Sequence, residues 1–370
     1  MHLKSLSLVS FKNYEQIDIP LSEKINCFVG ENGVGKTNIL DAVHYLALCK
    51  SNLNPVDTQN IMYDREFCVV QGIFDRSGKE ENIYCGIRRQ RKKQFKRNQK
   101  EYQKLSEHIG LIPLVMISPS DSVLINGGSE ERRKFMNGVI AQYSRLYLEN
   151  LIQYNRALAQ RNRLLRDFAL NRNFELNMLE IWDEQLIRYG EPIYLERKRF
   201  VDEILPVFNN FYEHVSGYRE AVTLSYKAQL NETTYREGLS NSVEKDRILQ
   251  YTTFGIHKDD LGMELGEHSL KKSGSQGQQK TFLVALKLAE FEFIRKLTEI
   301  PPILLLDDIF DKFDTYRVKQ IINLVAENHF GQIFITDTNE SRLFGILKEI
   351  PADHRVFRID HESNIIKMDA

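Results

Sequence analysis

The pattern of hydrophobic and polar positions changes period twice along the chain. In the first part, LKSLSLVSFKNY places Leu3, Leu6 and Leu8 among polar residues, and INCFVG (25–30) is a short apolar run. Both patterns indicate β-strands. A Gly-rich turn leads from INCFVG into the helical pattern TNILDAVHYLALCK. Further strands are predicted at EFCVVQGIFD and ENIYCGIRR, on either side of the turn RSGK, and at LIPLVMISPSD.

The middle of the chain has a helical period. Ser129 is a suitable N-cap, and two acidic residues follow it in the first turn, where the helix dipole favours anions. Apolar residues then recur every three or four positions, at Ile140, Tyr143, Tyr147, Leu151, Tyr154 and Leu158. NRN (171–173) interrupts the pattern, and a second helical stretch runs to about Gly217. We predict two long helices packed against each other as an arm.

The last third returns to mixed patterns. YREAVTLSYKAQL alternates like a strand, TTYREGLSNSVEKDRILQ is helical, and a helix begins at about Gln276. Strands are then predicted at PILLLDD, GQIFITD, VFRID and NIIKM, with helices between them. We therefore predict an α/β head in two parts, residues 1–125 and 218–370, split by an inserted helical arm of residues 126–217.

Composition narrows the class of protein. The chain has 370 residues, of which 42% are hydrophobic, enough for one large or two ordinary domains. Its net charge is −1, so a nucleic-acid binder of this composition has to gather its basic residues in patches. The four cysteines (27, 49, 68 and 85) form no C-x-x-C pair, which argues against disulfides and zinc. Without a signal-like start or a long apolar run, we expect a soluble cytoplasmic protein with no membrane partner.

The first chemical motif is G-E-N-G-V-G-K-T (30–37), which matches the P-loop pattern G-x-x-x-x-G-K-[ST]. Glycines let the backbone curl so that its N–H groups point at a phosphate, and the following helix adds its positive end. Lys36 is expected to reach the β- and γ-phosphates and Thr37 to hold Mg²⁺. A Gly-rich turn without ligand is the alternative. The expected ATP contacts are Gly30, Glu31, Asn32, Gly33, Val34, Gly35, Lys36, Thr37 and Asn38.

The second motif is I-L-L-L-D-D (303–308), an apolar strand that ends in two carboxylates. Ligands bind at the carboxyl ends of parallel strands. We expect Asp307 to hold Mg²⁺ through water and Asp308 to act as the general base toward the attacking water. Exposed acids at the end of a strand are the alternative. The predicted catalytic residues are therefore Lys36 and Asp308.

A third motif, K-K-S-G-S-Q-G-Q-Q-K (271–280), precedes a long helix and is expected to leave its N-terminus open to an anion. Because the P-loop already cradles the phosphates, a second such helix start is expected to grip them from another subunit. We therefore predict an ATP-dependent homodimer in which Ser275, Gln276, Gly277 and Gln278 contact the partner's ATP. The alternative is a capped core helix.

S-Q-G-Q-Q-K followed by A-L-K-L-A-E resembles the ABC signature in the form found in the RecF family. V-S-F-K-N-Y near the start, S-P-S-D (118–121) and G-I-H-K-D-D (255–260) resemble other segments of that family. In the same comparison, Asp314 corresponds to the D-loop aspartate and Asp337 lies near the usual switch histidine. Ser51 to Asn54 departs from the family's S-F-R-T, and no residue is assigned as γ-phosphate sensor.

The resemblance implies an ABC-type P-loop ATPase head that uses ATP and Mg²⁺, with weak, DNA-stimulated hydrolysis. It further implies recombinational repair. ATP-driven dimerisation would clamp double-stranded DNA near single-strand gaps or junctions, hydrolysis would release it, and RecO and RecR would help to load RecA.

A basic run, R-R-Q-R-K-K-Q-F-K-R-N-Q-K (88–100), contains no acidic residue. On a hairpin with its turn near Asn98, it would present cations to phosphates and Phe95 to a base. A solvated surface hairpin is the alternative. The expected DNA contacts are Arg88, Arg89, Arg91, Lys92, Lys93, Lys96 and Arg97. The predicted arm carries a second basic set, at Arg156, Arg161, Arg163 and Arg166.

Other functions share part of these features. A transporter-coupling ABC ATPase has both phosphate motifs but no use for the arm and the basic hairpin. A metabolic P-loop kinase does not need the second helix start, and an SMC-type chromosome ATPase has a much longer insertion. A non-hydrolysing scaffold remains open if Asp308 is poorly placed.

Overall fold

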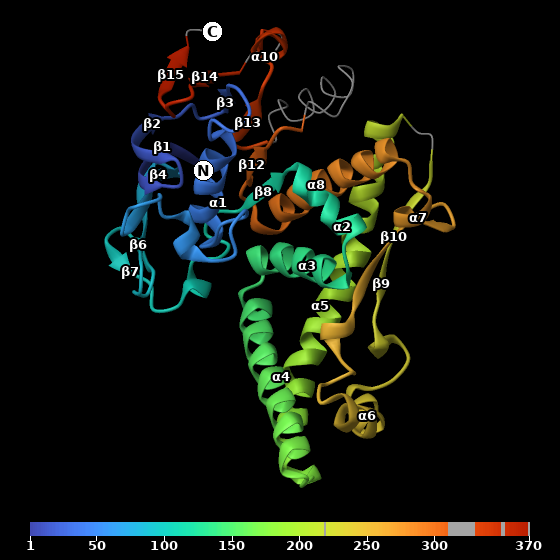
Figure 1. The fold of residues 1–370 in the computed structure, drawn as a ribbon. Helices are drawn as coiled ribbons and strands as arrows, with labels where there is room; N and C mark the ends of the chain where they lie inside the picture. Colours follow the sequence, from blue (N-terminus) through green and yellow to red (C-terminus); the bar gives the residue numbers. More distant parts are fainter. Residues whose placement is uncertain (218–219, 310–329, 349–351, 369–370) are drawn as a thin grey trace. The chain divides into compact units, whose positions relative to one another are not determined.

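The computed structural model describes residues 1–217, 220–309, 330–348 and 352–368. The chain divides into two compact units (Figure 1). The head unit consists of Met1–Asp121 and Glu290–Ala370, and the arm unit consists of Ser122–Ala289.

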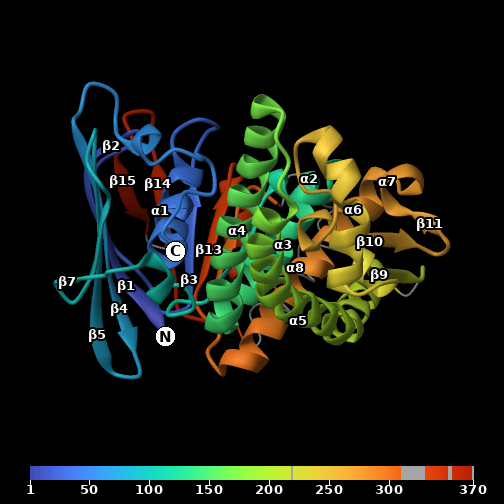
Figure 2. The ribbon, with the colours of Figure 1, turned by 90° about the horizontal axis from the view of Figure 1, so that it is seen from below.

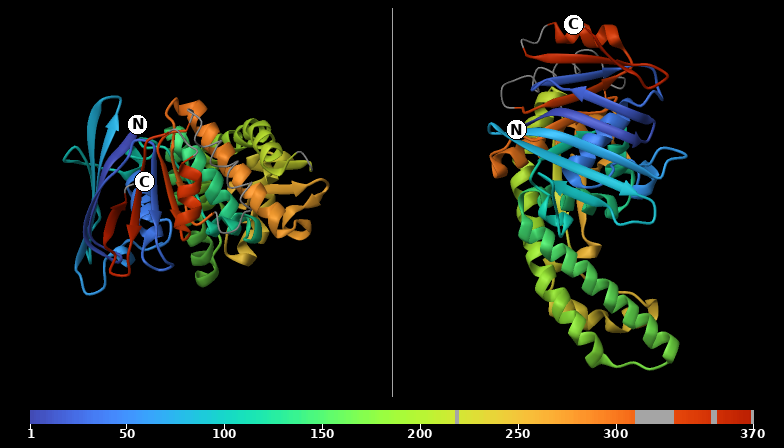
Figure 3. Two further views of the ribbon diagram at one scale, coloured as in Figure 1. Left: turned by 90° about the horizontal axis from the view of Figure 1, so that it is seen from above. Right: turned by 90° about the vertical axis from the view of Figure 1, so that its left-hand side faces the viewer.

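The head unit contains an antiparallel sheet of order β2-β1-β4-β5-β6-β7 (Figure 3). The predicted turn RSGK joins β4 to β5, with Ser77 and Gly78 both at positive φ. The strands of this sheet are β1 (His2–Phe11), β2 (Tyr14–Pro20), β4 (Phe67–Arg76), β5 (Lys79–Arg88), β6 (Gln94–Arg97) and β7 (Lys100–Glu101).

The second sheet of the head unit has the order β15-β14-β3-β13-β12-β8. Its strands pair in parallel except for β15 at the edge. Its central strands are continuous apolar runs because both of their faces are buried. The strands are β3 (Ile25–Val29), β8 (Leu114–Ile117), β12 (Ile303–Leu306), β13 (Ile333–Asp337), β14 (His354–Ile359) and β15 (Ile365–Met368).

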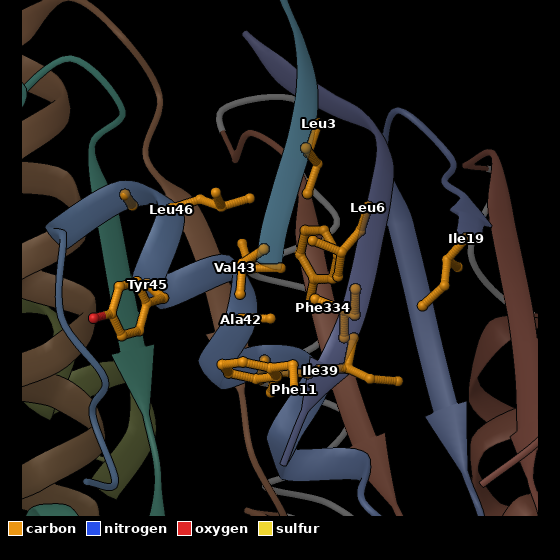
Figure 4. Packing of buried hydrophobic residues seen from close by; sticks show 14 of the residues in the cluster. Leu3, Leu6, Phe11, Ile19, Ile39, Ala42, Val43, Tyr45, Leu46 and Phe334 are labelled. Atoms are coloured by element: carbon orange, nitrogen blue, oxygen red, sulfur yellow. The ribbon is translucent and has the colours of Figure 1, made fainter. Parts of the chain in front are cut away.

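Helix α1 (Lys36–Leu48) packs between the two sheets, in contact with β4 and β5 of one and β8 and β13 of the other (Figure 2). Ile39, Val43 and Leu46 of α1 are fully buried together with Leu6 and Phe334 (Figure 4). A helix held on two sides is a rigid base for the loop that precedes it. Helix α10 (Glu340–Leu347) follows β13.

The arm unit is built on the two long helices that the apolar period predicts. Helices α4 (Arg145–Asn171) and α5 (Leu176–Ser216) pack against each other, and Arg172 ends α4 in a left-handed conformation within the predicted NRN break. The other helices are α2 (Val123–Asn126), α3 (Ser129–Tyr143), α6 (Tyr235–Leu249) and α7 (Leu270–Ser273), and α8 (Gln276–Thr298) begins in this unit. Its strands are β9 (Val222–Lys227), β10 (Asp260–Leu265) and β11 (His268–Ser269). Short 3-10 helices in the chain span Asp57–Asn60, Leu105–Glu107, Pro119–Ser122, Gln229–Asn231 and Ile256–Lys258.

The arm unit extends further along the chain than predicted. The division at 121/122 lies close to the predicted 125/126, but the second division falls at 289/290 instead of 217/218. The reason is that β9 packs against α5 and β10 against α3, so the three-stranded sheet joins the arm helices. A strand pattern gives no sign of which unit the strand packs against.

Two helix ends also differ from the prediction. Ser129 is the first residue of α3 and makes no side-chain cap, because Gly128 takes the N-cap position. Ser144 divides the predicted continuous stripe, since its hydroxyl accepts a hydrogen bond from the Tyr147 N–H and caps α4. Within the described residues, no helix has the length and apolar character needed to span a membrane.

Candidate functional site

The P-loop connects β3 to α1 in the predicted manner. Gly33 and Gly35 adopt φ of 87° and 111°, a region that side chains with a Cβ rarely occupy. Lys36 lies at the first position of α1, and its Nζ donates to the carbonyls of Gly30 (2.9 Å) and Glu31 (2.8 Å). The lysine ammonium is therefore held over the loop whose N–H groups are expected to meet a phosphate.

Asn13 braces this loop from the β1–β2 hairpin, a role that the sequence analysis did not identify. Its Nδ2 donates to the Val34 carbonyl (2.9 Å), and its Oδ1 accepts from Asn38 Nδ2 (2.6 Å). A Cβ on Gly35 would lie 2.3 Å from Asn13 Nδ2, so only glycine leaves room for the amide. The Tyr14 hydroxyl donates to the Gly35 carbonyl (3.1 Å). In the sequence, Asn13 and Tyr14 stand only in V-S-F-K-N-Y, a segment whose family resemblance carries no function by itself.

The two acidic residues lie next to the P-loop at the carboxyl end of the parallel sheet. Thr37 Oγ1 donates to Asp307 Oδ1 over 2.9 Å, so the predicted pair of magnesium ligands is brought together. Asp307 is buried, and this desolvation raises the pKa of its carboxyl, although hydrogen bonds from Thr336 and Thr37 oppose the shift. A hydroxyl and a carboxylate that meet in a desolvated place supply the oxygen ligands that Mg²⁺ prefers.

Thr336 on the neighbouring strand β13 links the two aspartates. Its hydroxyl donates to Asp307 Oδ1 (2.8 Å) and accepts from the backbone N–H of Asp308 (2.9 Å). Asp308 has a φ of 49°, which is unusual for a residue with a side chain. The sequence analysis missed Thr336, because its importance depends on the pairing of β13 with β12.

The helix start at Ser275 is exposed but not open, contrary to the prediction. Ser275 and Gln278 form a reciprocal cap, in which the Ser275 N–H donates to Gln278 Oε1 (2.7 Å) and the Gln278 N–H to Ser275 Oγ (3.3 Å). Gln278 Nε2 also donates to Glu220 Oε1 (2.6 Å). Gln276 and Gly277 are exposed, and a Cβ on Gly277 would meet no neighbouring atom. The cap satisfies part of the helix end and leaves this turn on the surface.

The basic run divides between the two faces of the antiparallel sheet. Asn98 and Gln99 form the predicted turn, with φ of 48° and 68°. Phe95 is wrongly predicted to stack on a base, because it is 1% exposed and packs against Tyr102 and His108.

Two of the seven predicted DNA contacts are engaged in ion pairs within the head unit. Lys93 Nζ donates to the Tyr45 hydroxyl (3.0 Å) and the Cys49 carbonyl (2.7 Å), and it pairs with Asp57 (2.9 Å). Arg97 pairs with Glu81. Both side chains are thus engaged within the head unit, although that of Arg97 remains 38% exposed. The other five predicted contacts are on the outside of the sheet: Lys96 lies over the Tyr84 ring, and four residues are exposed, namely Arg88, Arg89, Arg91 and Lys92.

Comparisons with known proteins agree with this geometry. The family model described as the RecF/RecN/SMC N terminal domain matches residues 2–353. The chain is 51% identical over 362 residues to the DNA replication and repair protein RecF of Bacteroides thetaiotaomicron, with 97% of each chain covered. It is 53% identical over 360 residues to RecF of Parabacteroides distasonis, covering 97% of this chain and 98% of that protein.

The chain belongs to the RecF family.

Solved RecF structures share the whole fold. The recombination mediator protein RecF of the RecFOR pathway, solved with ATP, matches with a TM-score of 0.90 at 27% identity, covering 100% of this chain and 98% of that one. A second structure of RecF, with ATPrS, matches with a TM-score of 0.89. An Smc head domain from Pyrococcus furiosus shares the fold at 18% identity and a TM-score of 0.57. The predicted RecF family and split ATPase head with a helical insertion are thus confirmed.

Family membership settles the choice between the functions considered from the sequence. The chain is a RecF-type DNA replication and repair protein whose head belongs to the RecF/SMC ATPase family. This decides against a transporter-coupling ATPase and a metabolic kinase.

One further RecF feature can be placed. Asp337 at the end of β13 is buried and accepts both Nε (3.1 Å) and Nη2 (2.7 Å) of Arg342, so an ion pair stands near the usual position of the switch histidine. Asp314, the predicted D-loop aspartate, lies outside the described residues.

The predicted basic set on the RecF arm is only partly at the surface. Arg156, Arg163 and Arg166 are exposed. Arg161 is 0% exposed and pairs with Asp183 (2.5 Å) and Asp246 (2.6 Å), so it stabilises the arm and cannot meet DNA.

Proposed function

We propose that this RecF chain is an ATP-dependent DNA clamp, in which two copies close when ATP joins the P-loop of one to the Ser275–Gln278 turn of the other. The observation that carries the proposal is that one P-loop and one acidic pair converge in the head unit, while the exposed Ser275–Gln278 turn belongs to the arm unit. Solved RecF relatives with ATP and ATPrS support the choice of nucleotide.

Each residue has a distinct task in this proposal. The P-loop N–H groups and Lys36 bind the β- and γ-phosphates, and Asn13 keeps the loop in its curled form. Thr37 and Asp307 would hold Mg²⁺, which neutralises charge on the phosphate oxygens when it is bound. Asp308, fixed through Thr336, orients the attacking water and accepts its proton.

Hydrolysis is expected to be slow and to open the dimer, because the binding energy of ATP is used to hold two copies together. Closure would surround double-stranded DNA, with a preference for gaps or single-strand junctions. The exposed cations Arg88, Arg89, Arg91 and Lys92 supply phosphate contacts in this arrangement. RecO, RecR and RecA are the proposed partners, in keeping with the RecFOR pathway of the solved relatives, and the proposed compartment is the cytoplasm.

Sedimentation of the protein with ATP, with and without duplex DNA, tests the clamp. We expect an ATP-dependent dimer that DNA strengthens. Asp308→Asn should retain ATP and accumulate as the dimer, because binding remains and proton removal is lost. Ser275→Arg should stay monomeric while one chain still binds ATP. A monomer under all conditions, or a Ser275→Arg dimer equal to the native one, would rule out the shared site.

A further inference from the structure

The antiparallel sheet of the head unit has one buried face and one outer face. On β4 and β5, side chains alternate between the two. The buried face carries Cys68, Val70, Phe74, Ile83 and Cys85, each at most 1% exposed. On the outer face, Phe67 is 48% exposed and Arg88 is exposed as well. A large aromatic side chain therefore remains in solvent at the end of a well-packed strand.

Aromatic and basic residues on this outer face lie directly opposite one another. Phe67 pairs with Arg88 across β4 and β5, and Tyr84 pairs with Lys96 across β5 and β6. Opposite residues of an antiparallel pair project to the same side, with Cβ atoms about 5 Å apart. Lys96 Nζ lies 5.4 Å from the centre of the Tyr84 ring. We name these four residues the aromatic–basic patch.

Gly86 determines how the Tyr84 ring lies. A Cβ built on Gly86 would be 2.8 Å from the Tyr84 hydroxyl oxygen and 3.1 Å from its Cε1 atom. The ring therefore leans over Gly86 along the surface of the sheet. A ring in this position offers a face to solvent once the flexible Lys96 side chain moves aside.

Charge is separated along the β4–β5 hairpin. Its acidic residues, Asp75, Glu80 and Glu81, lie near the turn at Ser77–Gly78, where Glu80 pairs with Lys4 and Glu81 with Arg97. The opposite end carries Arg88 and the exposed cations Arg89, Arg91 and Lys92, which outnumber the exposed Asp64 and Glu66 that precede β4. In the part of the chain that the structure describes, no carboxylate forms an ion pair with Arg88 or Lys96. This end of the hairpin thus suits a polyanion.

Cross-strand packing alone would explain why an aromatic ring stands beside a cation, since such pairs stabilise a sheet. It does not explain why, among the described residues, neither cation forms an ion pair, although Glu101 lies opposite Lys96 on β7, while Phe67 remains half exposed. We propose that the aromatic–basic patch binds unpaired nucleobases of DNA, with Phe67 and Tyr84 stacking on bases while Arg88 and Lys96 contact the adjoining phosphates. The inference rests on the proposed DNA-binding function and assigns the surface that takes its single-stranded part.

The test uses the full chain with ATP and two DNAs. One is a blunt duplex, and the other is the same duplex with a single-stranded tail that carries 2-aminopurine. Phe67→Ala and Tyr84→Ala should each weaken binding of the tailed DNA about tenfold or more, as expected for the loss of one stacked base. Binding of the blunt duplex should change less than about twofold, and the 2-aminopurine signal seen with the native protein should disappear.

Two variants serve as controls. Tyr84→Phe keeps the ring and should bind both DNAs as the native chain does. Tyr251→Ala removes an aromatic side chain of the arm unit that is 42% exposed and also lies under a lysine, Lys258, and it should leave both affinities unchanged. Thermal unfolding confirms that each variant is folded.

The outcomes separate the patch from the function on which it rests. If Phe67→Ala and Tyr84→Ala bind the tailed DNA like the native protein, the patch is not a base-binding surface, although DNA binding stands. An equal loss on both DNAs would mean contact with the duplex backbone alone and would also overturn the inference. If the native protein binds neither DNA, the proposed function itself fails.

Discussion

The Thr336 hydroxyl forms hydrogen bonds with both Asp307 and Asp308. It donates to Asp307, the proposed magnesium ligand, and accepts from the backbone of Asp308, the proposed base. Since Thr336 is fully buried, no water can replace these bonds without rearrangement. A residue of a separate chain segment thus fixes the Asp308 backbone relative to the Asp307 carboxylate.

Thr336→Val keeps the shape of the side chain and removes both hydrogen bonds. We expect ATP hydrolysis to fall about 10- to 100-fold, because a hydrogen bond to a charged group is worth about 1.5–3 kcal/mol. The KM for ATP should stay nearly constant, since the P-loop contacts remain. Steady-state kinetics measures both constants. Thr336→Ser retains the hydroxyl and should recover most of the rate; an equal loss in both variants would point to the packing of the methyl group instead.

At the scale of elements, the sequence predicts structures that neighbouring residues specify. It does not predict contacts between segments that are far apart in the chain. The P-loop, the ILLLDD strand and the two arm helices are each specified by neighbouring residues. Each forms as predicted, except that Ser144 divides the apolar stripe of the first arm helix. Asn13 acts through residues about twenty positions away and Thr336 through an adjacent strand, so a linear pattern does not reveal them.

The basic run illustrates the same limit. Its composition indicates a surface, but the two-residue period of β6 sends Phe95 and Arg97 to one face and Lys96 to the other. Which face is the inner one depends on where α1 packs. Similarly, the sequence does not distinguish Arg161 from the other cations of the arm. The structure shows that it is a core residue, because it pairs with Asp183 and Asp246.

Arg161 and Arg163 lie two residues apart on α4 and provide a matched pair for the arm. Arg161→Met would leave Asp183 and Asp246 without their buried cation, so we expect the free energy of unfolding of the arm to fall by about 3–5 kcal/mol. Arg163→Met removes an exposed side chain that lies 3.8 Å from Asp167. It should change the free energy of unfolding by less than about 0.5 kcal/mol. Urea denaturation of both variants measures the difference. Similar stabilities would show that the buried network contributes little.

At the scale of the whole molecule, the question is whether each ATP site takes parts from two copies. The described residues place the P-loop and acidic pair in one compact unit and the Ser275–Gln278 turn in the other. A symmetric dimer would contain two equivalent composite sites. This arrangement makes a prediction that a site within one chain does not share.

The Lys36→Ala protein and the Ser275→Arg protein should each fail to hydrolyse ATP. An equal mixture of the two proteins should hydrolyse it again. In a mixed dimer, the intact P-loop of the Ser275→Arg copy meets the intact turn of the Lys36→Ala copy, so one of the two sites is complete. Neither variant paired with itself has a complete site, so the dimers that ATP holds together in the mixture are mixed ones. Each has one complete site of two, and the expected rate is at most about half of native if the sites act independently. Phosphate release from the separate and mixed proteins, with DNA present, measures this. If mixing restores nothing although the two variants pair with each other, each copy must hydrolyse ATP with its own residues, and the clamp would need another cause for its closure.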